Sequence, residues 1–282
     1  MDKIADYREP GRGLMFWWLD RLLILAIAVF LWSVTHLFYR VTVHGKDNVP
    51  KGGRILFLVN HPSYFGIFAT IFAVFWPWVL GRRMDMIPVI IAKEKYVNVP
   101  LWRWLLLHFN VLSLPEQKEI RSQIVKRQVW LLTQLRSCAH WIYPEGTRTE
   151  QDQHLGQFRP GVGRVVAEAR PQVVFVYDYG SGQVWPKGRT LPRLPIRWFG
   201  PIPLPRRFPL EIRIFHPIDA NDKKTGLYQV CQSVSLEESG EPVAGYLRDL
   251  MWWGVTSFYP QLAQVEPASK RIFWEDWRTI TS

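Results

Sequence analysis

The sequence has few cysteines and lacks the short patterns that mark metal and nucleotide sites. Its two cysteines, Cys138 and Cys231, form neither a zinc-ligand spacing nor a disulfide framework. We therefore expect both to be buried, inert thiols in a protein of a reducing compartment. The sequence also holds no phosphate-binding P-loop and no dinucleotide-binding glycine signature. The sequence therefore shows no pattern typical of a zinc, nucleotide or dinucleotide site.

Acidic residues are also scarce relative to basic ones. The chain has 24 Asp and Glu against 35 Lys and Arg, which gives a formal net charge of +11 at pH 7. A positive surface favours an anionic partner, either nucleic acid or acidic lipid. The chain is 48% hydrophobic and has 15 Trp, and indole side chains gather at membrane–water interfaces. This balance predicts membrane lipid as the partner and argues against nucleic acid.

Long apolar runs without a charge are equally rare, and one segment alone could enter a bilayer fully. The run Leu22–Phe38 is 17 residues long and has no charged side chain, which is short for a spanning helix. Aromatic and basic residues that suit the membrane interface flank this run. We expect residues 1–40 to form an uncleaved membrane anchor, either a spanning helix or a steep monotopic one.

Downstream of residue 40, apolar strand-like runs alternate with helical patterns. Strands are predicted within residues 41–53, 54–61, 86–96, 111–114, 139–148 and 172–180, and helices at 67–80, 100–109, 115–137 and 159–170. Two strand-like pieces and two helical stretches follow, up to about residue 257. The pattern predicts an α/β domain over residues 41–260, with a mixed sheet flanked by helices and a short tail at 261–282.

Polar residues follow two of the predicted strands, at the end of a strand where α/β proteins bind ligands. His61 follows the apolar run RILFLV, and the loop PEGTR at residues 144–148 follows another strand. An Arg side chain matches phosphate oxygens in a bidentate way, and a carboxylate accepts hydrogen bonds from a polyol hydroxyl. A further Arg, Arg159, precedes a predicted helix, where free N–H groups also favour an anion. Together they predict a phosphate-bearing, hydroxylated substrate.

Each of these features also has a plainer interpretation. Taken alone, the loop at 144–148 fits a turn tied by a Glu–Arg pair, and His61 fits a structural histidine that donates to a backbone carbonyl. In the functional interpretation, His61 is a general base that takes the proton of a substrate hydroxyl, which then attacks an acyl thioester.

Five blocks in this order resemble the motifs of a known family: NHPSYFG, AKEK, YPEGTR, GQFRPG and FGPI. They are similar to motifs of the glycerolipid acyltransferases, a membrane-associated group that includes 1-acylglycerol-3-phosphate acyltransferase. The resemblance covers roughly residues 40–220. It implies transfer of a fatty acyl group from acyl-CoA or acyl carrier protein to a lysophospholipid such as 1-acylglycerol 3-phosphate.

The resemblance also assigns roles to residues. It makes His61 the general base and places Glu145, Gly146, Thr147 and Arg148 in the acceptor site. It further implies that the protein works without a cofactor at the cell inner membrane, with its active site on the cytoplasmic side.

One position departs from the family pattern. The first block of the family is His, four residues and Asp, whose carboxylate orients the His, and Gly66 stands at that last position. Three solutions are open: another acid such as Asp178 or Glu94 lies beside the ring, a backbone carbonyl or water orients it, or the chain is a catalytically silent lipid-binding relative. Because a thioester is already activated, we expect activity rather than silence. We also expect Gly66→Asp to preserve or raise activity if the helix there accommodates the side chain.

Overall fold

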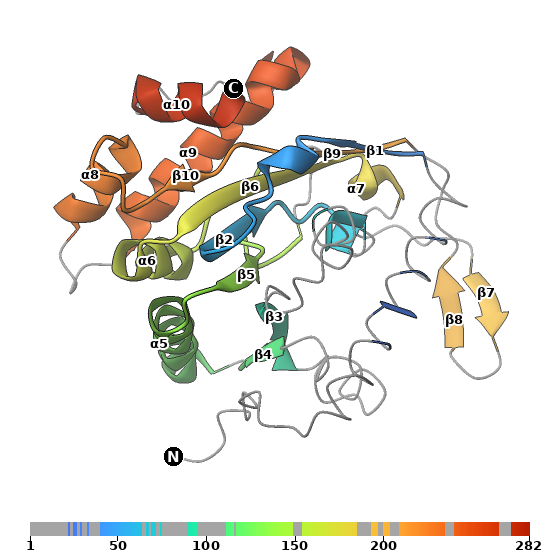
Figure 1. The fold of residues 1–282 in the computed structure, drawn as a ribbon. Helices are drawn as coiled ribbons and strands as arrows, with labels where there is room; N and C mark the ends of the chain where they lie inside the picture. The colour runs from blue at the N-terminus through green and yellow to red at the C-terminus, as the bar shows by residue number, and fades with distance from the viewer. Residues whose placement is uncertain are drawn as a thin grey trace.

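A mixed β-sheet lies at the centre of the computed structural model of the chain (Figure 1). The structure describes residues 22, 25, 26, 29, 33, 40–63, 66, 67, 69–71, 74, 89–94, 111–115, 117–148, 154–184, 193–196, 200–203, 209–234, 240–264 and 272–282. The strand order is β1-β9-β6-β2-β5-β3-β4, and β10 pairs with β6 beside β9. The strands are β1 (Val41–His44), β2 (Arg54–Val59), β3 (Val89–Lys93), β4 (Val111–Leu114), β5 (Cys138–Ile142), β6 (Gln172–Tyr179), β9 (Leu210–Ile214) and β10 (Ile218–Asp219).

The middle of the sheet is parallel. Strands β6, β2, β5, β3 and β4 all run in one direction, whereas β9 is antiparallel to β6, and β1 is parallel to β9. Parallel strands are covered on both faces, so their sequences are apolar throughout rather than alternating. Strand β2 follows this rule, because its residues from Ile55 to Val59 are all fully buried. The predicted α/β domain with a mixed sheet is confirmed.

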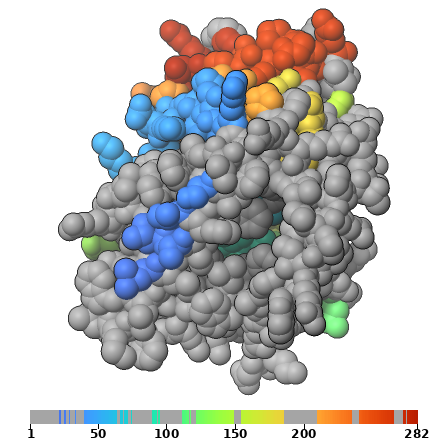
Figure 2. Space-filling model, turned by 90° about the vertical axis from the view of Figure 1, so that its right-hand side faces the viewer, coloured from blue at the N-terminus to red at the C-terminus, as the bar shows by residue number. Residues whose placement is uncertain are grey.

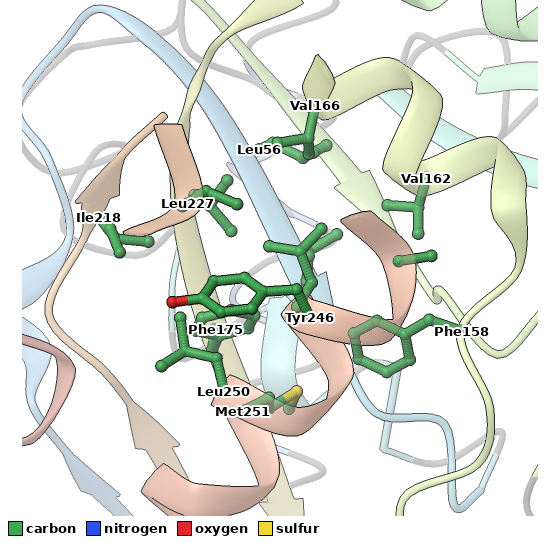
Figure 3. Packing of buried hydrophobic residues seen from close by; sticks show 14 of the residues in the cluster. Leu56, Phe158, Val162, Val166, Phe175, Ile218, Leu227, Tyr246, Leu250 and Met251 are labelled. Atoms are coloured by element: carbon green, nitrogen blue, oxygen red, sulfur yellow. The ribbon is translucent and has the colours of Figure 1, made fainter. Parts of the chain in front are cut away.

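Among the described elements, five helices contribute to the core on one face of the sheet. They are α5 (Lys118–Gln134), α6 (Pro160–Ala169), α8 (Gly226–Ser233), α9 (Glu241–Phe258) and α10 (Trp274–Thr281). Figure 3 shows how α6 and α9 bring their apolar side chains onto this face, with Val166 beside Leu56 and with Leu250 and Met251 near Phe175. This cluster fixes α6, and therefore the loop that precedes it, relative to β2.

Helices α6 and α9 cross at a pair of glycines. A Cβ atom placed on Gly163 would overlap with the backbone carbonyl oxygen of Gly240 and would lie 2.6 Å from the backbone nitrogen of Ala244. A Cβ on Gly240 would in turn overlap with the backbone of α6. The two backbones therefore touch directly, which no larger residue at position 163 allows.

The opposite face is covered by a second, smaller core. The described residues Gly66, Ile67, Ala69, Thr70, Ile71 and Val74 are helical. Within them, Ala69 and Val74 pack against Phe57 of β2 and Trp141 of β5 as part of one buried cluster. The predicted core helix at 67–80 is confirmed at these positions, and its remainder lies outside the described residues, as does the predicted helix at 100–109.

The C-terminal segment packs against the domain. Asp276 of α10 is fully buried and accepts hydrogen bonds from the backbone N–H groups of Gly226 and Leu227, at 2.8 and 2.7 Å. It also accepts a hydrogen bond from the hydroxyl of Tyr246, at 2.8 Å. One carboxylate thereby ties α10 to the first turn of α8 and to α9. The domain boundaries predicted at residues 40 and 260 stay predictions.

The predicted anchor lies almost wholly outside the described residues. The described positions between 22 and 33 are helical, and Leu22, Leu25 and Val29 are 60%, 40% and 45% exposed. In Figure 2 these residues form the dark blue area on one face of the molecule. Among the described residues, no helix has the length and apolar character needed to cross a membrane. The anchor therefore stays a prediction.

The remaining described elements lie outside this main sheet and its helices. Strands β7 (Arg193–Ile196) and β8 (Gly200–Pro203) form a separate antiparallel pair. The short helix α7 (Ser181–Val184) directly follows β6. The first residue of α7, Ser181, contacts a residue of the candidate site.

Candidate active site

The carboxyl ends of three neighbouring parallel strands bring the polar residues together. Strand β2 lies between β5 and β6, and Leu58 of β2 is in register with Ile142 of β5 and with Phe175 of β6. Residues that follow these three strands must therefore meet at one edge of the sheet. His61 follows β2, and the PEGTR loop follows β5, so the two predicted halves of the site lie side by side.

His61 is half-buried and is held by its surroundings on two sides. Its backbone N–H donates a hydrogen bond to Oε1 of Glu145, at 3.3 Å. Its imidazole ring lies against the ring of Tyr143, with 4.4 Å between the centroids and an angle of 33° between the planes. Burial raises the pKa of the Tyr143 phenol well above its ordinary value, so this neighbour stays neutral.

The turn after β5 presents Glu145 to His61. Glu145 is only 4% exposed, and Gly146 next to it has a φ of 71°, a left-handed conformation that suits glycine. The N–H of Gly146 donates to the carbonyl of Tyr143 at 3.0 Å and closes the turn. A Cβ on Gly156 would lie 2.9 Å from Oε2 of Glu145, so the backbone of that later loop packs directly on the carboxylate. The turn thus fixes a buried carboxylate beside His61.

Arg159 joins the same turn from the start of α6. Its backbone N–H donates to the carbonyl of Pro144 at 2.8 Å, and its Nε donates to the carbonyl of Glu145 at 3.2 Å. Arg159 itself is exposed, at the N-cap position of α6. Thr147 is exposed and Arg148 half-buried in the same loop. The predicted residues therefore gather around one turn, with His61 at its side.

Three residues at this edge were not assigned a role from the sequence: Asn60, Tyr143 and Ser181. The side chain of Asn60 donates to the carbonyl oxygen of Asp178 at 3.0 Å and accepts from its N–H at 2.7 Å. Ser181, at the start of α7, donates to Oδ2 of Asp178 at 2.5 Å. The signal for Asn60 was its place directly before His61 at the end of a buried strand.

The structure also decides what fits at Gly66. A Cβ atom on this glycine would overlap with Oδ2 of Asp178 and would lie 2.6 Å from the hydroxyl oxygen of Ser181. The condition set for Gly66→Asp, room for a side chain in this helix, is therefore not met while Asp178 is present. The expected gain or preservation of activity depended on that condition, so it does not follow for this single change.

The chemistry that these groups allow is proton transfer beside positively charged side chains. An imidazole can accept a proton, and two buried carboxylates lie at the same strand ends. One guanidinium group, that of Arg148, is on the adjoining loop, and a second, that of Arg159, is at the start of α6. In the part of the chain that the structure describes, no three His, Cys, Asp or Glu side chains gather closely enough to hold a metal ion.

Comparisons with known proteins fit this arrangement. The family described as Acyltransferase matches residues 40–178. Two chloroplastic 1-acyl-sn-glycerol-3-phosphate acyltransferases, from Arabidopsis thaliana and Brassica napus, are 27% and 26% identical over 163 residues, which is 56% of this chain. The match covers 42% and 43% of those proteins, so the chain spans less than half the length of the curated relatives it matches.

A solved structure shares the fold. The crystal structure of the 1-acyl-sn-glycerophosphate acyltransferase PlsC from Thermotoga maritima superposes with a TM-score of 0.58 at 21% identity, over 89% of this chain and 83% of that one. The ends of β2 and β5, where the candidate site lies, both fall within the matched segment. Residues 40–178, which contain His61, the PEGTR loop and Asp178, match the acyltransferase family.

Proposed function

We propose that the chain transfers a fatty acyl group from a thioester donor to the free hydroxyl of a lysophospholipid such as 1-acylglycerol 3-phosphate. The observation that carries the proposal is the contact between the two halves of the site: His61 at the end of β2 donates its backbone N–H to Glu145 of the PEGTR turn, at 3.3 Å. The names of the related plant enzymes support this acceptor class.

In the proposed reaction, Nδ1 or Nε2 of His61 takes the proton of the acceptor hydroxyl. The oxygen attacks the thioester carbonyl, the tetrahedral intermediate collapses, and the carbon–sulfur bond breaks. The leaving thiolate then receives the proton from the imidazolium, so the histidine returns to its neutral state. The neutral phenol of Tyr143 against the ring leaves His61 as the group that carries the proton.

The acceptor phosphate is assigned to the arginine side of the turn. The Nε–H of Arg159 donates to the carbonyl of Glu145, and this bond holds the Arg159 guanidinium beside the turn. Arg148 stands three residues after Glu145 on the same loop, and a pair of guanidinium groups suits a phosphate dianion. Glu145 holds the backbone of His61, so it couples the position of the acceptor loop to that of the base.

The donor and the location complete the proposal. Acyl-CoA and acyl carrier protein both present a thioester. Among the described residues of the site, no group distinguishes one donor from the other. We propose action at a membrane, the cell inner membrane with the site on the cytoplasmic side, on the strength of the +11 charge, the 15 Trp and the apolar run Leu22–Phe38.

A catalytically silent lipid-binding relative is the second candidate, because Gly66 removes the carboxylate that the family motif provides. The two candidates differ in turnover and agree in binding. We therefore expect purified full-length protein to acylate lysophosphatidate within a panel of lysolipids offered with acyl-CoA and with acyl carrier protein. Binding of lysophosphatidate without any acylated product, across the whole panel, would favour the silent relative.

The acceptor assignment has its own test. Glu145→Gln keeps the size of the side chain and weakens a charge-assisted hydrogen bond to His61, so we expect a loss in kcat/KM for the lysolipid. Glu168→Gln is the matched control: Glu168 pairs with Arg164 on α6, at 2.6 Å, away from the turn. Equal kinetics for both variants would contradict the assignment of Glu145.

A further inference from the structure

The missing carboxylate of the histidine motif has a replacement in space. Gly66 is buried and helical, at the position where the family motif has Asp. A Cβ atom on Gly66 would overlap with Oδ2 of Asp178, and Cγ of Asp178 lies 3.2 Å from that Cβ position. The carboxylate of Asp178 thus fills the volume into which the side chain of an aspartate at position 66 would extend.

Asp178 reaches this volume from a different strand. It lies near the end of β6, which pairs directly with β2, the strand that leads to His61. Glu94, the other acid considered, follows β3, and β5 separates β3 from β2. Sheet order therefore favours Asp178 over Glu94 as the acid near the imidazole.

Several contacts hold the carboxylate in place. Asn60 bonds both the N–H and the carbonyl of Asp178, which locks the end of β6 to the residue directly before His61. The Ser181 hydroxyl donates to Oδ2 at 2.5 Å, and the side chain of Asp178 is only 2% exposed. A buried carboxylate that accepts from a Ser, on a backbone fixed by an Asn, is preorganised rather than adaptable.

The charge of the Asp178 carboxylate acts on Tyr143, whose ring lies next to His61. Burial is the main reason why the pKa of Tyr143 is raised, and the negative charge of Asp178 raises it further. Since the ring of Tyr143 lies against the imidazole at 4.4 Å, the same charge acts close to His61. Around His61, Glu145 accepts from its backbone N–H and Tyr143 lies against its ring, and the charge of Asp178 acts on Tyr143.

We infer that Asp178 is the positioning carboxylate of His61, taking the role that the family motif gives to an aspartate at position 66. This inference rests on the proposed acyl transfer. Asp178 fixes the imidazole tautomer and stabilises the imidazolium that forms when the acceptor hydroxyl loses its proton, and it stays ionised throughout. The glycine at 66 is then a requirement of the site, because the space holds one carboxylate and its hydroxyl partner, and no second side chain.

The test moves the carboxylate from position 178 to position 66. Asp178→Ala and Gly66→Asp should each lower kcat, the first by loss of the carboxylate and the second by overlap with it. In other enzymes, loss of such a partner lowers kcat by roughly 10,000-fold, and we expect about 100-fold or more here. The double variant Gly66→Asp with Asp178→Ala restores one carboxylate to the same volume. It should recover at least about tenfold over either single variant.

A second readout separates positioning from folding. Asp178→Asn keeps the shape and removes the charge, so the acidic limb of the kcat/KM profile should move to lower pH by about one unit, with the melting temperature kept. Ser181→Ala, which leaves the carboxylate, should move this limb less. An unmoved limb in folded Asp178→Asn, or a folded double variant no faster than the single ones, would overturn the inference.

The inference can fail separately from the proposed function. If the wild type acylates no lysolipid, the titration of His61 is followed instead by NMR of carbon-13-labelled histidine, with the signal assigned by its loss in His61→Gln. A titration that moves to lower pH by about one unit in Asp178→Asn supports the pairing without any turnover. An identical titration in both proteins contradicts it.

Discussion

The buried histidine of β5 should make the stability of the domain depend on pH. His140 is 0% exposed, and burial lowers its pKa from 6.5 to about 3. Neither of its ring nitrogens has a hydrogen-bond partner among the described residues. Because the folded pKa is lowered, the unfolded chain binds more protons between these two values. The contribution of neutral His140 to stability is therefore fully present above the unfolded pKa, and it is lost as the pH falls from the unfolded pKa toward the folded one.

The size of the effect follows from the same two values. From about pH 8 to about pH 5, the unfolded histidine gains its proton while the folded one does not, which removes roughly 2 kcal/mol of unfolding free energy. This figure depends on the unfolded pKa alone, since the folded value lies far below pH 5. We expect urea unfolding, followed by tryptophan fluorescence, to show this loss in the wild type and a smaller one, by about 2 kcal/mol, in His140→Leu.

Cys138→Ala is the matched control. Cys138 lies on the same strand as His140 and, because side chains alternate along a strand, on the same face of the sheet. Burial raises the pKa of the Cys138 thiol to about 11, outside the pH range of the experiment. The Cys138→Ala substitution should lower the unfolding free energy by the same amount at pH 5 and at pH 8. A wild type and a His140→Leu variant with equal pH dependence would refute the reasoning that His140 is buried and neutral.

Three further results are expected. Gly163→Ala should lower the unfolding free energy by about 1 to 3 kcal/mol because its methyl group would overlap with the backbone of α9. By contrast, Gly245→Ala, with nothing within 4 Å of its Cβ position, should be neutral or stabilising by up to about 1 kcal/mol; equal losses in both would contradict the close crossing. The thiols of Cys138 and Cys231, buried and with pKa values raised by burial to about 11, should react with a thiol reagent only upon unfolding, and rapid labelling of the native protein would refute this. Finally, Arg148→Lys should raise KM for the phosphorylated acceptor more than KM for the thioester, and equal changes in both would remove the phosphate assignment.

Much of the fold was predictable because its signals are local. The apolar run of β2 and the helical spacing of α5 and α6 depend on residues close together in the chain. These predicted elements are confirmed with shifts of a few residues at their ends. The meeting of His61 with the PEGTR turn was also predictable, since the carboxyl ends of parallel strands lie at one edge.

The role of Asp178 could only be raised as one of several options, because it depends on strand order. Nothing in the sequence states that β6 lies directly beside β2 while β5 separates β3 from it. The same limit applies to Gly66. From the sequence it is an absent side chain, whereas in the structure its missing Cβ is the space that Asp178 and Ser181 occupy. The burial of Asp276 beneath α8 and α9 was missed for a related reason, since a polar, aromatic segment resembles a tail until its partners are known.

The central claim, acyl transfer with His61 as the base, is tested most directly by a paired product measurement. Purified full-length protein in lipid nanodiscs receives lysophosphatidate and acyl-CoA, or acyl carrier protein in a parallel reaction, and free thiol and diacyl product are quantified together by mass spectrometry. His61→Gln serves as the inactive variant, since it keeps the backbone N–H that bonds Glu145, and His44→Ala serves as the control, on β1, which β9 and β6 separate from β2. The account predicts one thiol released for each diacyl product in the wild type and in His44→Ala, and neither in His61→Gln. Wild-type rates in His61→Gln, or thiol release without diacyl product in the wild type, would contradict it.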